Sequence, residues 1–237
     1  MISPNDPTRS ASEPHRHHAA TVRLSLSEIN ALCLKAARGA GLGWGEAEEA
    51  GWAASWLSRA GLSGPSITLA WLTEAGRLAR PAPAPDRWTA TSGAQCPLRC
   101  GIALADFAGL PEGPGARVLT LERVAYPLMV LPFVARATAR AGSGQRVRWG
   151  HGEAVLNAAD IPLRLDLTGD AGPQAADLVI TPVDHSDLSG IAQTAPPPIP
   201  DISDADWRAL DALALRITVP SSTQSRAGAG AAGTDND

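Results

Sequence analysis

The segment from Leu119 to Gly142 is the most apolar stretch of the chain, and it restricts the fold more than any other feature. Charged residues stand near both of its ends, and the residues between them leave no polar stripe. A helix that is apolar on every side belongs in a protein core or in a membrane. Because the uncharged run is well short of the ~20 residues that a membrane span needs, the segment predicts a buried central helix. We expect Leu128, Leu131 and Val134 to lie in the core.

Two prolines interrupt this apolar segment. Pro127 suits a first helical turn, where its missing N–H group is not needed. Pro132 would then stand inside the helix, where proline kinks the helix or restarts it. The central helix is therefore expected to begin near Pro127 and to change direction near Pro132.

Three consecutive helices are predicted near the start of the chain. Ser25 and Glu28 form a capping box before the first of them, and apolar residues follow at helical spacing. The second helix starts near Gly45, with glutamates in its first turn, where the helix dipole favours carboxylates. The third helix runs from Pro65 to about Arg80. Small residues on one face of the second helix predict a close approach to a neighbouring helix.

Shorter elements are expected on both sides of the central helix. A strand over Asp86–Ser92, a helix over Pro97–Ala108 and a strand over Arg117–Leu121 precede it. After it the hydrophobic period changes from helical to alternating, which is typical of strands. Two runs around Gly150 predict a hairpin, and further strands are predicted over the ranges Leu163–Leu167 and Leu178–Val183. These strands together indicate an antiparallel meander with one face on the central helix.

The fold class that we expect is α+β. An N-terminal helical unit precedes a buried central helix packed on the antiparallel β-meander, and a C-terminal helix over Asp204–Ile217, capped by Ser203, leads into a Gly/Ala-rich tail. The expected parts are a disordered tail, a three-helix unit, an α+β body and a Gly/Ser-rich C-terminal tail, over residues 1–21, 22–80, 86–219 and 220–237 respectively.

Composition and charge exclude several classes of protein. The net charge is −4 and no basic stripe with interleaved aromatic residues occurs, so we expect no nucleic-acid partner. Lys35 is the only lysine and stands in a helical pattern, which excludes a P-loop. No signal-peptide pattern and no membrane span are expected. Three cysteines argue against a disulfide framework and favour a reducing compartment, so the expected location is the cytoplasm.

Cys96 and Cys100 are the sequence features closest to a reactive site. A zinc site needs four ligands and no second pair stands near them, so we expect no metal and no cofactor. The favoured interpretation is two partly buried structural thiols. The alternative is that Cys96, at the start of a helix, has a lowered pKa and acts as a nucleophile with His151 or His185 as its base. Cys96 and His185 are accordingly the candidate catalytic residues.

The C-terminal tail supplies the candidate binding residues. A match to the dinucleotide fingerprint at Gly228–Gly233 is rejected, because no strand precedes it and no helix follows it. The last four residues and the terminal carboxylate offer oxygen groups that could pair with an arginine or a hard cation. We hypothesise that the tail folds back onto Arg38 at the glycine-rich turn between the first two helices. The candidate binding residues are Arg38, Glu48, Glu49, Arg226, Asp235, Asn236 and Asp237.

Several strings resemble a known family. The residues around Ala36–Gly41 and Trp44–Gly51, with Cys96-Pro97 and the closing Thr234–Asp237, resemble a bacterial family catalogued as domain of unknown function 3726. The resemblance runs from about Leu24 to the end of the chain and implies no activity. The first two helices also look similar to the start of the malate/L-lactate dehydrogenases that lack a Rossmann fold. The Ser-His-Gly of those enzymes is missing here, and Ser63-Gly64-Pro65 stands in that place.

Two functions are compatible with these features. The first is a cytosolic binding or assembly protein that supports a metabolic enzyme, with a protein partner or a second copy of the chain. The alternative is a small-molecule enzyme with a site near Cys96, Arg38 and the C-terminal tail. The lack of a complete catalytic motif in the sequence favours the first.

Overall fold

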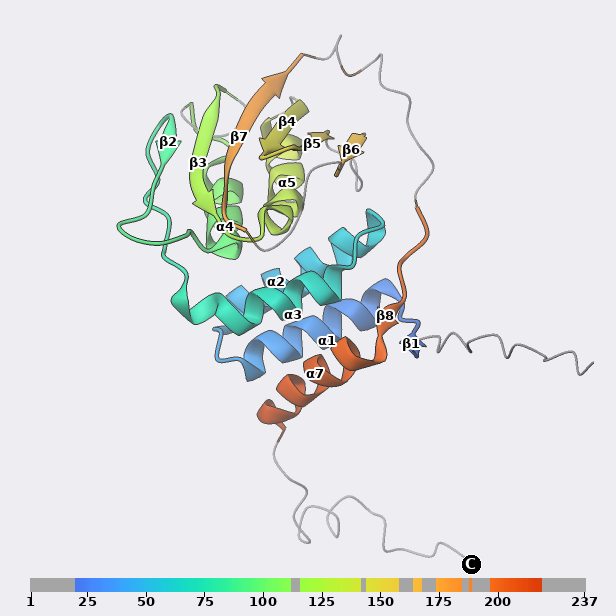
Figure 1. The fold of residues 1–237 in the computed structure, drawn as a ribbon. Helices are drawn as coiled ribbons and strands as arrows, with labels where there is room; N and C mark the ends of the chain where they lie inside the picture. Colours follow the sequence, from blue (N-terminus) through green and yellow to red (C-terminus); the bar gives the residue numbers. More distant parts are fainter. Residues whose placement is uncertain are drawn as a thin grey trace, which may run out of the picture.

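The structure, a computed structural model, describes residues 20–111, 116–141, 144–157, 164–167, 174–184, 188 and 197–218. Its elements fall into a helical group and a sheet with two covering helices, which lie one above the other in Figure 1. The helix α2 lies on the side of the helical group that contacts α4, η2 and α5. The architecture is α+β, as the sequence predicts.

The helical group begins with the helices expected between residues 22 and 80. The capping box of Ser25 and Glu28 is present, with both reciprocal hydrogen bonds. The third helix ends earlier than expected, because a short 3₁₀ turn replaces its last part. The elements are β1 (Thr21–Val22), α1 (Leu26–Gly39), α2 (Trp44–Arg59), α3 (Gly64–Glu74) and η1 (Ala75–Arg77).

Small residues allow α1 and α2 to pack closely. A Cβ atom added at Gly51 would lie 2.6 Å from the Asn30 carbonyl oxygen, so the two backbones are too close for a larger residue. Four alanines of α2 have no exposed surface: Ala47, Ala50, Ala53 and Ala54. The predicted close helix approach is therefore present.

The C-terminal helix packs on α1 and α3. Ser203 caps it through a hydrogen bond from the Asp206 amide, and β8 (Ile202–Ser203) pairs antiparallel with β1. A Cβ atom at Gly39 would lie 1.8 Å from the Leu213 carbonyl oxygen, and Ser66 donates a hydrogen bond to Asp206 at 2.5 Å. The helical group therefore includes α7 (Asp204–Ala214) and η3 (Leu215–Ile217). The domain boundaries given above stay a prediction.

The apolar segment Leu119–Gly142 contains a strand, a 3₁₀ turn and an α-helix. Its first part is a strand that runs to Val124, beyond the predicted end at Leu121 and before the helix that was expected from Pro127. Alternate residues of this strand are buried, and it pairs with a strand that follows the helix in sequence. Arg123 and Tyr126 have positive φ values of 49° and 47°, and they turn the chain from the strand into the helix.

The helical part of this segment forms the centre of the core, as predicted. Pro127 begins a 3₁₀ turn, and the α-helix restarts at Leu131, next to Pro132. Leu128, Leu131 and Val134 are all buried. Within the described ranges no helix is long and apolar enough to cross a membrane. The helices on this side of the molecule are α4 (Pro97–Phe107), η2 (Pro127–Val130) and α5 (Leu131–Ala141).

The sheet is mixed, and it is not the simple meander that the sequence predicted. Its order is β2-β3-β7-β4-β5-β6, so β7 returns to a central place between β3 and β4. The pair β2–β3 is parallel, and the hairpin expected around Gly150 forms the antiparallel pair β4–β5. An alternating pattern identifies the buried face of a strand and not its neighbours. The strands are β2 (Arg87–Trp88), β3 (Leu119–Val124), β4 (Gly144–Trp149), β5 (Gly152–Leu156), β6 (Arg164–Asp166) and β7 (Ala176–Val183).

Candidate functional site

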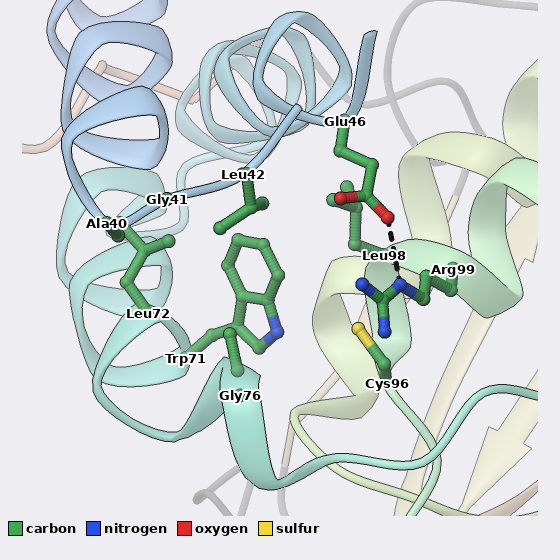
Figure 2. A pocket seen from close by; sticks show the side chains of 11 residues that line it. Ala40, Gly41, Leu42, Glu46, Trp71, Leu72, Gly76, Cys96, Leu98 and Arg99 are labelled. Atoms are coloured by element: carbon green, nitrogen blue, oxygen red, sulfur yellow. Dashed lines mark hydrogen bonds and ion pairs between the residues drawn. The ribbon is translucent and has the colours of Figure 1, made fainter. Parts of the chain in front are cut away.

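A pocket lies where the helical group meets the start of α4. Its volume is about 180 Å³, and three segments far apart in sequence form its wall. Figure 2 shows the indole of Trp71 and the thiol of Cys96 facing the pocket, with the Glu46–Arg99 ion pair beside them. The lining residues that the following argument uses are Leu42, Glu46, Trp71, Leu72, Cys96 and Arg99.

The turn between α1 and α2 forms one wall of the pocket. Gly41 adopts a φ of 98°, a backbone conformation that residues other than glycine rarely adopt. This turn places Leu42 beside the pocket, and the amide of Leu42 donates to the Ala37 carbonyl at 3.1 Å. Glu46 follows in the first turn of α2 and faces α4. The glycine-rich turn that the sequence singled out is therefore part of the site.

Cys96 is the N-cap residue of α4 and is 2% exposed. Burial raises the pKa of its thiol above the ordinary value, against the opposite effects of the Arg99 and Leu98 amides, the Arg99 charge and the Trp71 indole. No side-chain capping hydrogen bond forms in the described structure, although these donors lie close enough to favour the thiolate. The thiol is therefore protonated near neutral pH, contrary to the lowered pKa expected for a nucleophile at this position.

Arg99 joins α4 to the helical group. Its Nε atom donates to Glu46 Oε1 at 2.8 Å, and both side chains are roughly one-third exposed. Hydrogen bonding to Glu46 raises the pKa of the Arg99 guanidinium. Arg99 stands in the first turn of α4, which contains no acidic residue, so its positive charge adds to the positive end of that helix.

Trp71 closes the pocket from the side of α3. The residue is 1% exposed, and its Nε1 atom makes no hydrogen bond of normal geometry among the described atoms, although it lies close enough to the weak acceptor of the Cys96 thiol to favour the thiolate. A buried N–H group without a partner costs free energy comparable to a lost hydrogen bond. The unpaired indole N–H at the wall of a pocket therefore points to an acceptor on a ligand.

The other two cysteines are buried away from this pocket wall and, like Cys96, are free thiols. Burial raises the pKa of Cys33 to about 12 and also raises the pKa of Cys100. The Cys100 thiol donates to Gln95 Oε1 at 3.5 Å. These surroundings fit the expected structural role, and no group of three or more metal-ligating side chains occurs in the described ranges.

The predicted binding residues do not all come together. Arg38 lies over the Trp44 ring at 4.5 Å and donates to the Leu42 carbonyl, so it supports the turn without lining the pocket. Glu48 is exposed on α2. Glu49 accepts two hydrogen bonds from Arg136, at 2.8 and 2.9 Å, and thereby links α2 to α5. The remaining candidates lie outside the described residues: His185, Arg226, Asp235, Asn236 and Asp237.

Sequence reasoning missed the partners of Cys96 in the pocket. Glu46 appeared to be an ordinary first-turn carboxylate, and Trp71 appeared to be a core residue. Arg99 could have been identified from the sequence, because a cation in the first turn of a helix is unfavourable next to the positive end of the helix dipole. Its position therefore predicts an anionic group nearby. No local pattern linked these residues, since they come from three separate helices.

The solved structures that resemble this chain include two malate dehydrogenases, and both similarities are distant. Malate dehydrogenases from Entamoeba histolytica and from Pyrococcus horikoshii OT3 each align with 9% sequence identity and a TM-score of 0.41. The first alignment covers 57% of this chain and 44% of that protein, and the second covers 81% and 65%. The chain thus spans less than two thirds of either enzyme. Similarities at this level carry no information about activity.

Comparison at the level of sequence families confirms one resemblance. No curated protein matches significantly. The matching family model covers α1 to α4, which contribute every wall of the pocket, and it ends before the central helix. The model of the family described as Protein of unknown function (DUF3726) matches residues 24–113 of the chain.

Proposed function

We propose that this chain is a cytosolic protein that binds a small metabolite in the pocket between the α1–α2 turn, α3 and α4. The observation that supports this most is the buried indole N–H of Trp71, which has no partner among the described atoms and lies in the pocket wall. Ligand sites commonly combine apolar walls with a few polar groups that fix the orientation of the ligand. The free cysteines are consistent with a reducing compartment.

The size of the pocket limits the ligand. A cavity of about 150 Å³ in a protein core accommodates a benzene molecule, and the pocket here has a volume of about 180 Å³. The ligand, or the part of it that enters, therefore has on the order of six to nine non-hydrogen atoms.

Binding is favoured over thiol catalysis at this site. A nucleophilic cysteine needs a thiolate, and burial raises the pKa of Cys96. Among the described residues of the pocket wall, the other ionisable side chains are Glu46 and Arg99, which are paired with each other. The enzyme alternative would need a base from elsewhere in the chain.

A metabolite screen by thermal shift tests the proposal. A ligand present at 100 times its Kd should stabilise the protein by about 2.7 kcal/mol. Gly76 lines the pocket and a Cβ atom there meets no other atom within 4 Å, so Gly76→Phe adds a ring at the pocket wall without a backbone clash. Hits should lose their effect in Gly76→Phe and keep it in Gly45→Phe, which adds the same ring outside the pocket. Hits that persist in both variants would place binding elsewhere.

A role in assembly is the second candidate, and exposed apolar side chains favour it. Trp44 is 62% exposed at the start of α2, and Leu215 and Ile217 are exposed on η3. The element η3 contacts α1, whose C-terminal end leads directly into the turn before Trp44. Light scattering would show a dimer or a complex that Trp44→Ser and Leu215→Ser weaken. A monomer with no partner would contradict this role.

A further inference from the structure

We propose that the ligand is a small carboxylic acid whose carboxylate sits at the N-terminal end of α4, between the Trp71 indole and the Arg99 guanidinium. The inference rests on the proposed function and names the chemical class of its ligand. Three independent features of the pocket wall favour a negative group at this position.

The first feature is the indole N–H of Trp71. Trp71 is 1% exposed, its Nε1 atom is buried without a partner among the described atoms, and the indole faces Cys96 in Figure 2. An indole nitrogen can only donate a hydrogen bond. The missing partner is therefore an acceptor, which excludes an ammonium group and favours an oxygen of the ligand.

The second feature is the start of α4. Its N-cap residue Cys96 offers only a weak acceptor and makes no capping hydrogen bond in the described structure. Pro97 occupies the first helical position, so the amide groups of this end come from Leu98 and Arg99, and both lie close enough to Cys96 to favour its thiolate. Amide groups and the helix dipole together make a helix N-terminus a site for anions. An acceptor placed here would satisfy donors that the protein leaves open.

The third feature is the charge of Arg99. Its cation stands at the positive end of α4, and within the described residues Glu46 is the acidic side chain that pairs with it. Glu46 engages the Nε atom, which leaves the two terminal nitrogens of the fork for a second carboxylate. Glu46 is thus a built-in competitor: a ligand carboxylate shares Arg99 with it or displaces it.

The remaining walls describe the other end of the ligand. Leu42, Leu72 and Leu98 line the pocket with apolar surface. A ligand that fits therefore joins one carboxylate to a compact apolar body, with on the order of four to seven carbon atoms, given the cavity size. Benzoate and 3-methylbutanoate have this shape and serve as probes.

The test compares each probe acid with its primary amide, which has the same shape and no charge. Binding is followed by calorimetry up to about 50 mM, because ligands of this size bind with Kd values of micromolar to millimolar order. We expect each acid to bind at least about tenfold more tightly than its amide, as a charge-assisted hydrogen bond predicts. Trp71→Phe should abolish that preference, whereas Trp44→Phe, at an exposed tryptophan, should keep it.

A substitution of Glu46 provides the sharpest control, because it should strengthen the binding of the acids, whereas Trp71→Phe should weaken it. Glu46→Gln should strengthen binding of both acids several-fold and leave the amides unchanged, since it removes the competing carboxylate. Glu48→Gln, at an exposed position of the same helix, should change neither. A merely structural role of the Glu46–Arg99 pair predicts weaker binding of acid and amide alike.

The possible outcomes separate the two proposals. Amides that bind as tightly as the acids, acids that fail to bind, or a Glu46→Gln variant that weakens acid binding would each overturn the carboxylate inference. The wider proposal of a metabolite pocket survives all three results if any neutral or cationic compound binds and is lost in Gly76→Phe. It fails only if no compound depends on the pocket.

Discussion

The guanidinium of Arg99 and the carboxylate of Glu46 meet at 2.8 Å and join the first turn of α4 to the first turn of α2. The two helices belong to different parts of the molecule, and the pair forms part of the wall of the pocket between them. The same contact therefore connects α4, next to the sheet, to the helical group. It also places the charged side chains of Arg99 and Glu46 at the candidate site. The stability of this junction and its chemistry can be tested separately.

Gly101 is predicted to be essential for the packing of α4 against α5. A Cβ atom at Gly101 would lie 2.2 Å from the Phe133 ring. Gly101→Ala should cost about 1–3 kcal/mol in the free energy of unfolding, as overpacking does, and the cost should shrink when Phe133→Leu is also present. Gly45→Ala, at an open helical position, should be neutral or stabilising. Urea denaturation measures all four variants, and an equal cost of Gly101→Ala in both backgrounds would contradict the predicted contact.

Leu131 is predicted to be one of the main core residues. Its side chain has no exposed surface at the start of α5. Leu131→Ala should lower the free energy of unfolding by about 2–5 kcal/mol. Leu110 is 48% exposed, so Leu110→Ala should change it by less than about 0.5 kcal/mol. Similar melting temperatures for the two variants would show that α5 is peripheral.

The individual helices and strands could be predicted from the sequence, but the order in which the strands pair within the sheet could not. Capping residues such as Ser25 and Ser203 act on adjacent amides, so they identify helix starts without knowledge of the rest of the chain. The central place of β7 depends on pairing between strands far apart in sequence, which no local pattern encodes. The strand over Leu119–Val124 ends later than the predicted end at Leu121, because the apolar pattern alone does not show where a buried strand stops.

Of the residues that form the candidate site, the sequence identified Cys96 as a candidate and did not identify its partners. Cys96, next to a proline at a predicted helix start, was a candidate catalytic residue. The glycine-rich turn was predicted to lie beside the candidate binding site. Trp71 could not be distinguished from a core tryptophan, because its role depends on one nitrogen atom that lacks a partner among the described atoms. Burial raises the pKa of the Cys96 thiol, which supports the structural role that the sequence analysis favoured over the reactive alternative.

Alkaline pH should destabilise the protein through its buried thiols. Burial raises the pKa of Cys33 from 9.0 to about 12. Above pH 9 the unfolded chain releases this proton and the folded chain keeps it, so stability is fully present below the unfolded pKa and falls as pH rises towards the folded pKa. Each such thiol contributes a loss of about 1 kcal/mol per pH unit. Cys33→Ala should show a shallower decline between pH 9 and 11 and an unchanged slope below pH 8.

Glu49 should contribute to stability, and its neighbour Glu48 should not. Glu49 pairs with Arg136, whose guanidinium also lies 3.6 Å from the centre of the Trp52 ring. Glu49→Gln should lower the free energy of unfolding by about 0.5–1 kcal/mol, because the pair is partly exposed. High salt should reduce the difference. Glu48→Gln should have no measurable effect, and an equal effect of both variants would indicate a general charge effect.

The most direct test of the account is the indole N–H signal of Trp71 in a ¹H–¹⁵N correlation spectrum. Its disappearance in Trp71→Phe assigns it among the seven tryptophans. Titration with benzoate should move this signal downfield as the free N–H gains a carboxylate acceptor, while benzamide at the same concentration should move it far less and the signal of exposed Trp44 should stay in place. A Trp71 signal that stays fixed at saturating benzoate, or that moves equally with the amide, would contradict a carboxylate site at the start of α4.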